Sequence, residues 1–352
     1  MKIGILTHHY IKNYGAFLQV YALQETLKKE FPNDEIYVIN YINRKHLIIN
    51  MAGWFRFNPR KDTFKNYFQK ITIPSIFNTM EKKYLNLTKK VYNFKQVNNL
   101  NLDAIIIGSD EVWHYEDKKS YDPIKFGLGL SCKNIITYAP SLGSSNIAKA
   151  PLEVIEGLKN IKEFSARDDL AEKLVEKYTQ KKCIRVLDPT FLYDFPEYSS
   201  NVVDRLKEEK YILMYYCDGL PENKKYLIQQ YAKKNNLKIY GAGEYKKWFD
   251  AFPININPFE WVEMFRNAEL IFTGTFHGTV FSIKSEKQFF NYLSNPSRIK
   301  KVSSLLNEFG INNRTSFFDK KNIDYQKINI NILKMRKKSI KYVKEAITEE
   351  GK

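Results

Sequence analysis

Residues 270–284 read LIFTGTFHGTVFSIK, and this stretch decides the fold class. Leu270–Thr273 predicts a buried strand, Thr273–Thr279 a loop with two glycines, and the residues from Thr279 onward a helix. A strand that passes through a short loop into a helix is the repeating unit of α/β proteins with a mainly parallel sheet. In such proteins the loops at the carboxyl ends of the strands surround the ligand, so we expect the chemistry in loops of this kind.

The same alternation runs through the rest of the chain. Further strand-like runs fall at 2–7, 35–41, 104–107, 134–138, 163–166, 211–216, 238–240 and 288–292. Helix-like runs fall at 16–29, 152–160, 169–178, 223–235, 258–266 and 330–350. The stretch 195–200, with Pro196 and two serines, is typical of a boundary. We therefore predict an α/β fold of two Rossmann-like domains, 1–195 and 201–318, with an interdomain cleft, followed by a basic helix over 319–352.

Composition excludes several classes of protein. The 352 residues include 24 Tyr and 24 Phe, enough large side chains for substantial cores, so we do not expect disorder. The three cysteines show no C-x-x-C spacing and suggest neither disulfides nor a cysteine zinc site, which favours a reducing cytoplasm. The N-terminal apolar run is too short for a signal peptide. No apolar run approaches the roughly 20 residues of a bilayer span, so any membrane association is peripheral.

The formal charge of +17 is concentrated in two segments. Residues 44–100 contain twelve Lys and Arg against two acids, a net charge of +10, and residues 320–352 carry a net charge of +6. The remaining body of the protein is therefore nearly neutral. The basicity is local and lies outside the predicted strand and loop framework.

The first basic segment, an insertion over about 44–100, is also rich in aromatic residues. This mixture suits an anionic membrane surface, an anionic glycan or nucleic acid; alternatively, the segment is a helical insertion with core aromatics and a solvated lysine face. No zinc-finger, RNA-recognition or leucine-zipper pattern accompanies it, so we do not expect nucleic acid as a partner.

In the loop quoted above, His277 stands at the start of a helix, beside Gly278 and Thr279. Backbone N–H groups and the helix dipole at such a position favour an anion, so we expect the N–H groups of Gly278 and Thr279 to face one. His277 then suits the role of an acid acting on a phosphate-bearing substrate. The alternative is a loop histidine that only hydrogen-bonds the backbone.

A second loop contains Ser165-Ala166-Arg167-Asp168, again where a strand leads into a helix. Asp168 or Ser165 is placed to cap the helix. Arg167 offers a bidentate clamp for a carboxylate or phosphate, whereas the alternative is a surface pair with Asp168 or Asp169.

The turn after the first strand reads HHYIKNYGA at residues 8–16. Gly15 lets the backbone approach a ligand, and His9, Asn13 and Tyr14 offer polar contacts, although a plain capped turn fits equally well. Neither a P-loop nor a G-x-G-x-x-G motif is present. Two adjacent histidines without a carboxylate or cysteine at ligand spacing do not predict a metal site.

A fourth loop, Gly108-Ser109-Asp110-Glu111-Val112-Trp113, follows the strand at 104–107. Ser109 or Asp110 is placed as a helix cap. A Trp113 face beside carboxylates also suits a sugar ring, and Asp110 suits the role of a base that deprotonates an attacking hydroxyl.

Taken in order, these motifs resemble the polysaccharide pyruvyl transferase family. The ordered set spans roughly residues 3–310 and consists of N-Y-G-A at 13–16 with Gln19 and Y-A-L-Q at 21–24, G-S-D-x-V-W at 108–113, S-x-R-D at 165–168, L-D-P-T-F-L at 187–192 and F-H-G-T at 276–279. Each motif is short, but their order along one chain makes the resemblance specific.

The resemblance implies a glycosyltransferase-B-like fold and transfer of a pyruvyl group from phosphoenolpyruvate onto two hydroxyls of one sugar, as a cyclic ketal. His277 matches the general acid of the family and Arg167 its phosphoenolpyruvate-binding arginine. Thr275, Gly278 and Thr279 then belong to the donor site of the C-terminal domain. The expected acceptor site of the N-terminal domain comprises His9, Asn13, Tyr14, Gly15, Ser109 and Trp113. Asp110 is the second expected catalytic residue, and neither cofactor nor metal is expected besides phosphoenolpyruvate as co-substrate.

The chain departs from the family at Thr275. Some members carry an arginine there, two residues before the histidine, and others a serine. Loss of this positive charge removes one contact to the donor, for which Lys284, Arg298 or Lys300 would have to substitute.

The leading hypothesis is a cytoplasmic pyruvyl transferase of bacterial surface-glycan assembly, acting on a lipid-linked or nucleotide-linked sugar and peripheral on the inner face of the plasma membrane. Two rivals stay open. One is a glycosyltransferase of the same architecture that uses a nucleotide sugar. The other is a non-catalytic glycan- or lipid-binding protein that binds through the basic aromatic segment.

Overall fold

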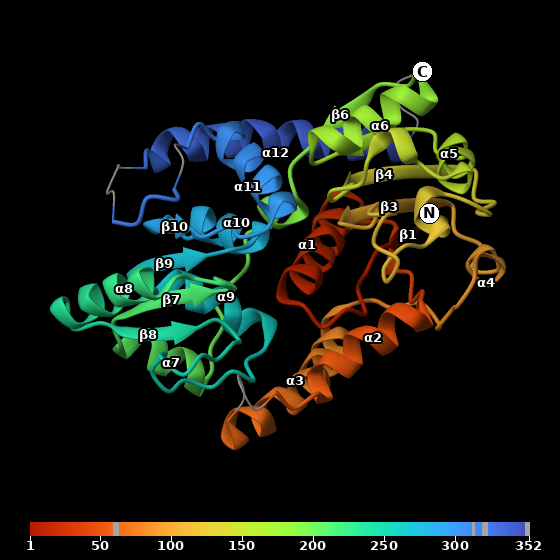
Figure 1. Cartoon of the computed structure of the whole chain (residues 1–352). Coiled ribbons are helices and arrows are strands. Elements are labelled where there is room, and N and C mark those ends of the chain that lie inside the picture. Colours follow the sequence, from red (N-terminus) through yellow and green to blue (C-terminus); the bar gives the residue numbers. More distant parts are fainter. Residues whose placement is uncertain (59–62, 312–313, 319–322, 349–352) are drawn as a thin grey trace. The chain divides into compact units, whose positions relative to one another are not determined.

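Parallel strands joined by helices organise both halves of the chain in the computed structural model, which describes residues 1–58, 63–311, 314–318 and 323–348 (Figure 1). The chain forms two units. Unit 1 comprises residues 1–52, 80–195 and 332–352, and unit 2 comprises residues 53–79 and 196–331. Parts of the basic insertion (59–62), of the expected second domain (312–313) and of the expected terminal helix (319–322 and 349–352) lie outside the described residues.

Unit 1 is built on a four-stranded parallel sheet with the strand order β2-β1-β3-β4. In the pairing of β1 with β3, Ile3 is opposite Ala104 and Leu6 is opposite Ile107. The strands are nearly continuous apolar runs, as expected for a parallel sheet that is covered on both faces. A parallel pair, β5 and β6, adjoins β4 through a bridge between Ile136 and Glu163. The elements are β1 (Lys2–Leu6), α1 (Tyr14–Glu30), β2 (Glu35–Val38), α4 (Phe94–Asn98), β3 (Ala104–Asp110), η1 (Pro123–Phe126), β4 (Asn134–Pro140), η2 (Ile147–Lys149), α5 (Leu152–Lys159), β5 (Phe164–Ala166), α6 (Asp169–Thr179), β6 (Cys183–Arg185) and η3 (Pro189–Phe191).

Unit 2 repeats this design with the strand order β10-β9-β7-β8, all parallel. Tyr215 at the end of β7 is opposite Thr273 at the end of β9, so the loops that follow these two strands start side by side. Helix α10 packs against α9 and α11. The elements are α7 (Asn201–Glu208), β7 (Tyr211–Tyr215), α8 (Glu222–Lys234), β8 (Lys238–Gly241), α9 (Pro258–Asn267), β9 (Leu270–Thr273), α10 (Phe276–Lys284), β10 (Phe289–Asn291) and α11 (Pro296–Glu308).

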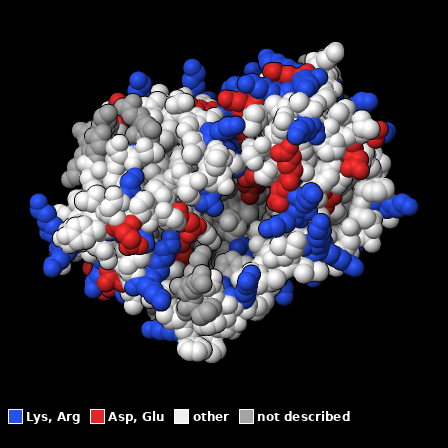
Figure 2. Space-filling view, viewed as in Figure 1, with Lys and Arg blue, Asp and Glu red and all other residues white. Residues whose placement is uncertain are grey.

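The basic insertion is helical, with α2 (Arg44–Phe55) and α3 (Phe64–Tyr84) as its main elements. Its aromatic residues divide between two environments. Phe77 is fully buried, whereas Phe64 and Phe68 are 76% and 62% exposed. Many of its lysines are exposed as well, and basic side chains protrude over the face drawn in Figure 2, with acidic ones among them. The insertion therefore has buried aromatic side chains and a solvated lysine face, as in the second interpretation. It also has exposed aromatic side chains that do not belong to the core.

The C-terminal helix α12 (Tyr325–Thr348) differs from the separate basic helix expected over 319–352. From residue 332 onward it belongs to unit 1, where its polar side chains bond backbone groups. The Tyr342 hydroxyl donates to the Thr137 carbonyl at 2.9 Å, and the Ser339 hydroxyl accepts from the Leu187 N–H at 3.0 Å. This half of the helix is thus part of the unit 1 core, because Val343 and Ile347 are also buried.

The units also differ from the predicted domains in the insertion. Residues 53–79 belong to unit 2 and not to the N-terminal domain, because they pack with the residues that follow 196. The chain passes from unit 1 to unit 2 between Phe195 and Pro196, in the stretch marked as a boundary by its sequence. Within the described ranges, no helix combines the length and the apolar character that a bilayer span requires.

Candidate functional site

The first loop of unit 1 is held rigidly at the carboxyl end of β1. Asn13 caps α1, its side-chain oxygen accepting from the Ala16 N–H at 3.1 Å. The Lys12 ammonium forms a buried ion pair of 2.6 Å with Glu81 of α3, and Tyr10 bonds the His46 imidazole of α2. Both helices of the insertion therefore fix the position of this loop.

The predicted acceptor residues of this loop lie in different environments. Asn13 is exposed, whereas Tyr14 and Gly15 are buried in the first turn of α1. His9 is only 1% exposed and bonds Asn40 at 3.2 Å. Burial lowers the pKa of His9 to about 4, so its imidazole is neutral. The structure thus contradicts His9 as an open ligand contact and makes it a support of the loop.

Arg167 lies at the carboxyl end of β5 and is buried. Because it is buried, it does not form the surface pair with Asp168 or Asp169 that was the alternative. One guanidinium nitrogen bonds Asp188 at 2.5 Å, and the other bonds Asp110 at 3.0 Å. Burial alone would lower its pKa, but Asp188 and Asp110 outweigh burial and raise it. Arg167 is therefore a permanently charged group of fixed orientation at the sheet edge.

Asp188 explains why the chain carries Leu187-Asp188-Pro189-Thr190. The second oxygen of the Asp188 carboxylate accepts hydrogen bonds from the N–H and the hydroxyl of Thr190, at 3.0 and 2.6 Å. Thr190 thus fixes the Asp188 carboxylate, and this carboxylate in turn fixes the Arg167 guanidinium. The motif is visible in the sequence, but the sequence does not reveal that Asp188 is the partner of Arg167.

Asp110 ends β3 with its side chain 19% exposed, the most open group of this cluster. Its backbone has a φ of 78°, in the left-handed region that a non-glycine residue adopts only when its surroundings impose it. Gly108 shows how tightly the strand end is packed, because a Cβ there would lie 2.1 Å from the Tyr138 carbonyl oxygen. Asp110 is thus held beside Arg167 by a constrained strand end.

Two expectations for this loop are wrong. Trp113 is fully buried, with its indole N–H bonded to the Lys125 carbonyl at 2.8 Å and its ring stacked on Phe126, so no face is open to a sugar. Ser109 is also fully buried and accepts the Asp110 N–H, which excludes an open acceptor contact. Neither Ser109 nor Asp110 caps a helix, because turns follow β3. Asp168, in contrast, caps α6 as predicted, by accepting from the Ala171 N–H.

A buried lysine near the first loop was missed in the sequence. Lys125 is fully buried, and its ammonium forms no hydrogen bond with any residue that the structure describes. Burial lowers its pKa to about 8. His8 and His46, whose rings are 5.1 Å apart, lie near enough for the lysine charge to lower their pKa values further. Such a group is costly to bury, and the Trp113–Phe126 segment gives no local signal for it.

In unit 2, Thr275 is the N-cap of α10. Its hydroxyl accepts the Gly278 N–H at 3.0 Å, and its carbonyl accepts both the N–H and the hydroxyl of Thr279. The expectation that these two N–H groups face an anion is therefore wrong in this structure, because Thr275 occupies both. A Cβ at Gly278 would lie 2.0 Å from the Thr273 hydroxyl, so only glycine fits there.

His277 lies in the first turn of α10 and is partly exposed, with its ring edge-on to Phe276. Its Nε2 atom is buried although the side chain is partly exposed, and the residue stands at the positive end of the helix dipole. His277, Thr275, Gly278 and Thr279 belong to unit 2, whereas Arg167 and Asp110 belong to unit 1.

Arg298 of α11 is the cation that the structure brings to the His277 loop. Its guanidinium lies 3.4 Å from the Gly274 carbonyl oxygen. Lys300, on the same helix, is exposed. Arg298 is therefore placed against the loop, whereas Lys284 lies at the far end of α10.

Two further groups at this sheet edge were missed, Tyr216 after β7 and Glu244 after β8. The Tyr216 N–H bonds the Glu244 carboxylate at 2.6 Å, and burial raises the pKa of Glu244 to about 7. Both residues follow predicted strands, and this position alone could have marked them as candidate site residues. A titratable group with such a shifted pKa is typical of functional sites.

Comparison with solved structures supports the fold. The chain is similar to a protein described as a UDP-N-acetylglucosamine 2-epimerase from Listeria monocytogenes, with 8% identity, 99% of this chain and 94% of that chain covered, and a TM-score of 0.50. It also matches a UDP-GlcNAc 2-epimerase from Methanocaldococcus jannaschii (13% identity, 96% and 93% covered, TM-score 0.47) and the glycosyltransferase SsfS6 from Streptomyces sp. SF2575 (10% identity, 98% and 99% covered, TM-score 0.46). At 8% identity, the first likeness shows the fold alone. It agrees with the expected glycosyltransferase-B-like fold of two Rossmann-like units.

Comparison of sequences supplies the family. A search of curated proteins finds no match. The family model of the polysaccharide pyruvyl transferases matches residues 13–297, a range that contains every motif from Asn13 to Thr279. These motifs hold the residues described above: the cap of α1, the Arg167 pair with Asp188, and the His277 loop. The chain belongs to the polysaccharide pyruvyl transferase family.

Proposed function

We propose that this transferase moves a pyruvyl group from phosphoenolpyruvate onto two hydroxyls of one sugar, as a cyclic ketal, during assembly of a cell-surface polysaccharide. The observation that carries the proposal is the buried Arg167 guanidinium, held at a sheet edge beside the partly exposed Asp110. A fixed cation next to a carboxylate suits a phosphate-bearing donor that reacts with a hydroxyl nucleophile. The family match over residues 13–297 supports the same reaction.

In the proposed reaction, His277 protonates C3 of phosphoenolpyruvate, which makes C2 electrophilic. The first sugar hydroxyl forms a bond to C2 and gives its proton to Asp110, which balances the proton that His277 lost. The bond between C2 and the phosphate oxygen then breaks, and the second hydroxyl closes the ketal. The proton of the second hydroxyl leaves with the phosphate. No cofactor takes part, and phosphoenolpyruvate is the co-substrate.

The charge balance around Arg167 indicates that the donor needs a further cation. Two carboxylates, Asp188 and Asp110, face the single positive charge of Arg167. These three side chains together carry a net charge of −1, so the cluster alone does not attract an anionic donor. Arg298 beside the Gly274 carbonyl is our candidate for the missing charge, in the role that arginine at position 275 has in other members.

We assign the protein to the inner face of a membrane, through the α2–α3 insertion. Phe55, Phe64 and Phe68 are all more than half exposed, and exposed lysines such as Lys45 and Lys65 belong to the same helices. Aromatic side chains insert at the level of the lipid headgroups, and lysines favour anionic lipids. In this proposal the acceptor is a lipid-linked or nucleotide-linked sugar that is presented in the cytoplasm.

The experiment that tests the proposal is incubation with phosphoenolpyruvate and candidate acceptor sugars, with phosphate release as the readout. Release that depends on the acceptor supports pyruvyl transfer. The rival glycosyltransferase would instead release a nucleoside diphosphate from a nucleotide sugar and would ignore phosphoenolpyruvate.

A further inference from the structure

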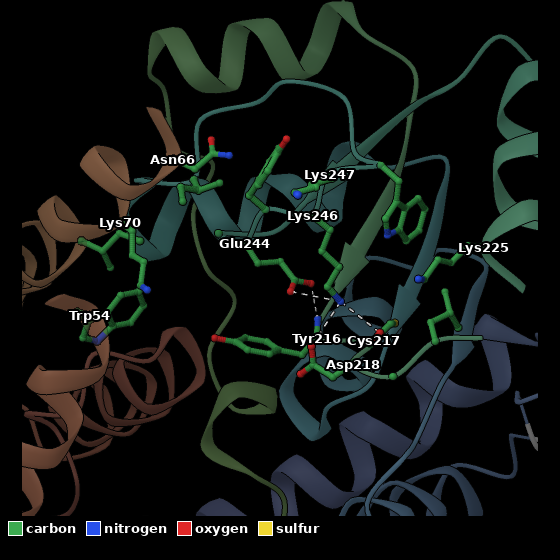
Figure 3. A pocket seen from close by; sticks show the side chains of 17 residues that line it. Trp54, Asn66, Lys70, Tyr216, Cys217, Asp218, Lys225, Glu244, Lys246 and Lys247 are labelled. Carbon is green, nitrogen blue, oxygen red and sulfur yellow. Dashed lines mark hydrogen bonds and ion pairs between the residues drawn. The ribbon is translucent and has the colours of Figure 1, made fainter. Parts of the chain in front are cut away.

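Unit 2 contains a pocket of about 600 Å³ at the carboxyl ends of β7 and β8 (Figure 3). Tyr216, Asp218 and Glu244, from the loops after these strands, line one part of it. Trp54 of α2 and Lys70 of α3 line another part, from the helical insertion. Cavities of this size hold ligands as large as a nucleotide, and a three-carbon donor would fill only a small part.

The pocket adjoins the His277 loop. Tyr216 lines the pocket and also packs against that loop, because a Cβ at Gly274 would lie 2.2 Å from the Tyr216 carbonyl oxygen. Burial raises the pKa of the Tyr216 hydroxyl, and the charge of Arg298 lowers it by a smaller amount. Arg298, which contacts the Gly274 carbonyl, therefore also lies near Tyr216. Tyr216 therefore links the pocket to the loop that carries His277.

Most of the charged residues that line the pocket are lysines. Four lysines and two acids line it: Lys70, Lys225, Lys246 and Lys247, and Asp218 and Glu244. Lys225 is paired with Glu222, and Lys70 donates to the Arg56 carbonyl at 2.8 Å. Lys246 is engaged by the protein, lying 3.5 Å from Asp218 and 3.7 Å from Glu244 and donating to the Cys217 carbonyl at 3.2 Å. Lys247 is exposed and forms no ion pair or hydrogen bond with the described residues. The positive charge of Lys247 is thus left for an anionic ligand.

Two indole rings line the pocket together with these lysines. Trp248 packs against the core of unit 2, with its ring 4.6 Å from that of Phe249. Trp54 is half-buried and lies in Figure 3 on the same side as Lys70 and Asn66. An indole face next to ammonium groups suits a ligand that carries both a planar ring and negative charge, because bases stack on aromatic side chains. A diphosphate alone would need no such ring.

We propose that this pocket binds the nucleoside diphosphate portion of the acceptor, with the base on Trp54 and the diphosphate on Lys247 and Lys70. This inference rests on the proposed function, since it assigns a substrate class to the same transfer reaction. It makes the acceptor a nucleotide-linked sugar whose sugar ring points toward the His277 loop. The insertion then has a role in acceptor binding, because α2 and α3 supply Trp54 and Lys70.

The test is titration calorimetry on the full chain, without phosphoenolpyruvate, with uridine, guanosine and thymidine diphosphates, inorganic pyrophosphate and farnesyl diphosphate as probes. We expect at least one nucleoside diphosphate to bind at least about tenfold more tightly than pyrophosphate, since stacking on one base is worth about a factor of ten. If none of the three nucleoside diphosphates binds more tightly than pyrophosphate, the proposal is overturned. The proposal is also overturned if farnesyl diphosphate binds most tightly of all the probes, because that result would indicate an acceptor linked to a lipid carrier.

Three variants separate stacking from charge. Trp54→Ala should weaken nucleotide binding about tenfold and leave pyrophosphate binding unchanged. Lys247→Gln should weaken both, and Lys233→Gln, an exposed lysine of α8 outside the pocket, should weaken neither. Unchanged nucleotide affinity in Trp54→Ala overturns the proposal. Thermal unfolding of each variant checks that the fold is retained.

Product analysis distinguishes this inference from the proposed function. If a nucleotide binds as expected but phosphoenolpyruvate yields no pyruvylated product with any acceptor, the proposed function fails and the nucleotide pocket stands. If a ketal forms on an acceptor without a diphosphate and no nucleotide binds, the pocket assignment alone fails. Loss of the sugar from a bound nucleotide sugar would make the nucleotide part of a donor and would overturn the acceptor role.

Discussion

Asp188 holds the guanidinium of Arg167 with one carboxylate oxygen while Thr190 holds its other oxygen. Both charged side chains are almost completely buried, so the pair sets the position of Arg167 and, through it, of Asp110. The family motifs that contain these residues are separated in the sequence, but they meet at one edge of the unit 1 sheet. The first prediction follows from this pair.

Asp188→Asn should destabilise the protein and reduce phosphate release from phosphoenolpyruvate. Removal of one partner from a buried ion pair costs about 3 to 5 kcal/mol of unfolding free energy. Chemical denaturation measures this loss, and steady-state kinetics measures the activity of the fraction that stays folded. Asp194→Asn is the matched control, because Asp194 pairs with Arg336 at the surface and should change stability by about 1 kcal/mol or less. Equal effects of the two substitutions would contradict the role of Asp188.

Arg298→Gln should raise the KM for phosphoenolpyruvate about tenfold or more, because it removes the cation at the His277 loop. The kcat should change less than the KM, since the charge acts on donor binding. Lys300→Gln, an exposed cation on the same helix, should leave both constants unchanged. An equal rise of KM in both variants would contradict a specific role of Arg298, because it would show that donor binding depends only on the net charge of α11.

Lys125→Met should stabilise the protein, because it replaces a buried and unbonded ammonium with an apolar side chain of similar length. The pKa of Lys125 falls from 10.5 in the unfolded chain to about 8 in the folded protein. The unfolded chain therefore binds more protons between these two pH values, and stability rises with pH through this window. The burial penalty is largest below pH 8, at about 3 kcal/mol, and is lost above pH 10.5.

The measurement is the free energy of unfolding of wild type and Lys125→Met at pH 7.5 and pH 10. The difference between the two proteins should shrink as the pH rises. Because other groups titrate equally in both proteins, this difference isolates Lys125. A difference that is independent of pH, or a less stable variant at pH 7.5, would contradict an unpaired ammonium at this position.

Anionic vesicles should bind the protein more strongly than neutral ones, and added salt should weaken this binding. Phe64→Ser combined with Phe68→Ser should reduce binding to anionic vesicles, because these rings are exposed on the basic insertion. Leu152→Ser is the control, since Leu152 is equally exposed on α5, outside the insertion. Co-sedimentation measures all three proteins, and equal binding to neutral vesicles would count against the electrostatic part of the proposal.

Strands could be predicted from the sequence where their apolar runs are continuous. The runs that become β1 and β7 are buried along almost their whole length, so their pattern is unambiguous. The strand β6 was missed because Cys183–Arg185 is three residues long and only half-buried. The start of α10 was placed too late, since Gly278 suggested a loop. In the structure it lies within the helix, where the Thr273 hydroxyl leaves no room for a side chain.

The candidate site was predicted only in part, because local motifs do not reveal tertiary partners. The capping of α6 by Asp168 depends on neighbouring residues, and the sequence indicated it. For α1 the sequence indicated a capped turn only as an alternative, and the structure shows that Asn13 is the cap. The pairing of Arg167 with Asp188 joins residues 21 positions apart in different strand–loop units. Trp113 was misread because its burial depends on Phe126, on a segment without a regular strand pattern.

The proposed enzyme transfers a pyruvyl group and uses His277 as its acid. Mass spectrometry of acceptor sugars after incubation with phosphoenolpyruvate tests this proposal most directly. We expect a product heavier than the acceptor by one pyruvate less one water, together with release of phosphate. We also expect that His277→Ala forms no such product although it remains folded. An unmodified acceptor with the wild-type protein, across nucleotide-linked and lipid-linked sugars, or an unchanged yield of ketal with His277→Ala, would contradict the proposal.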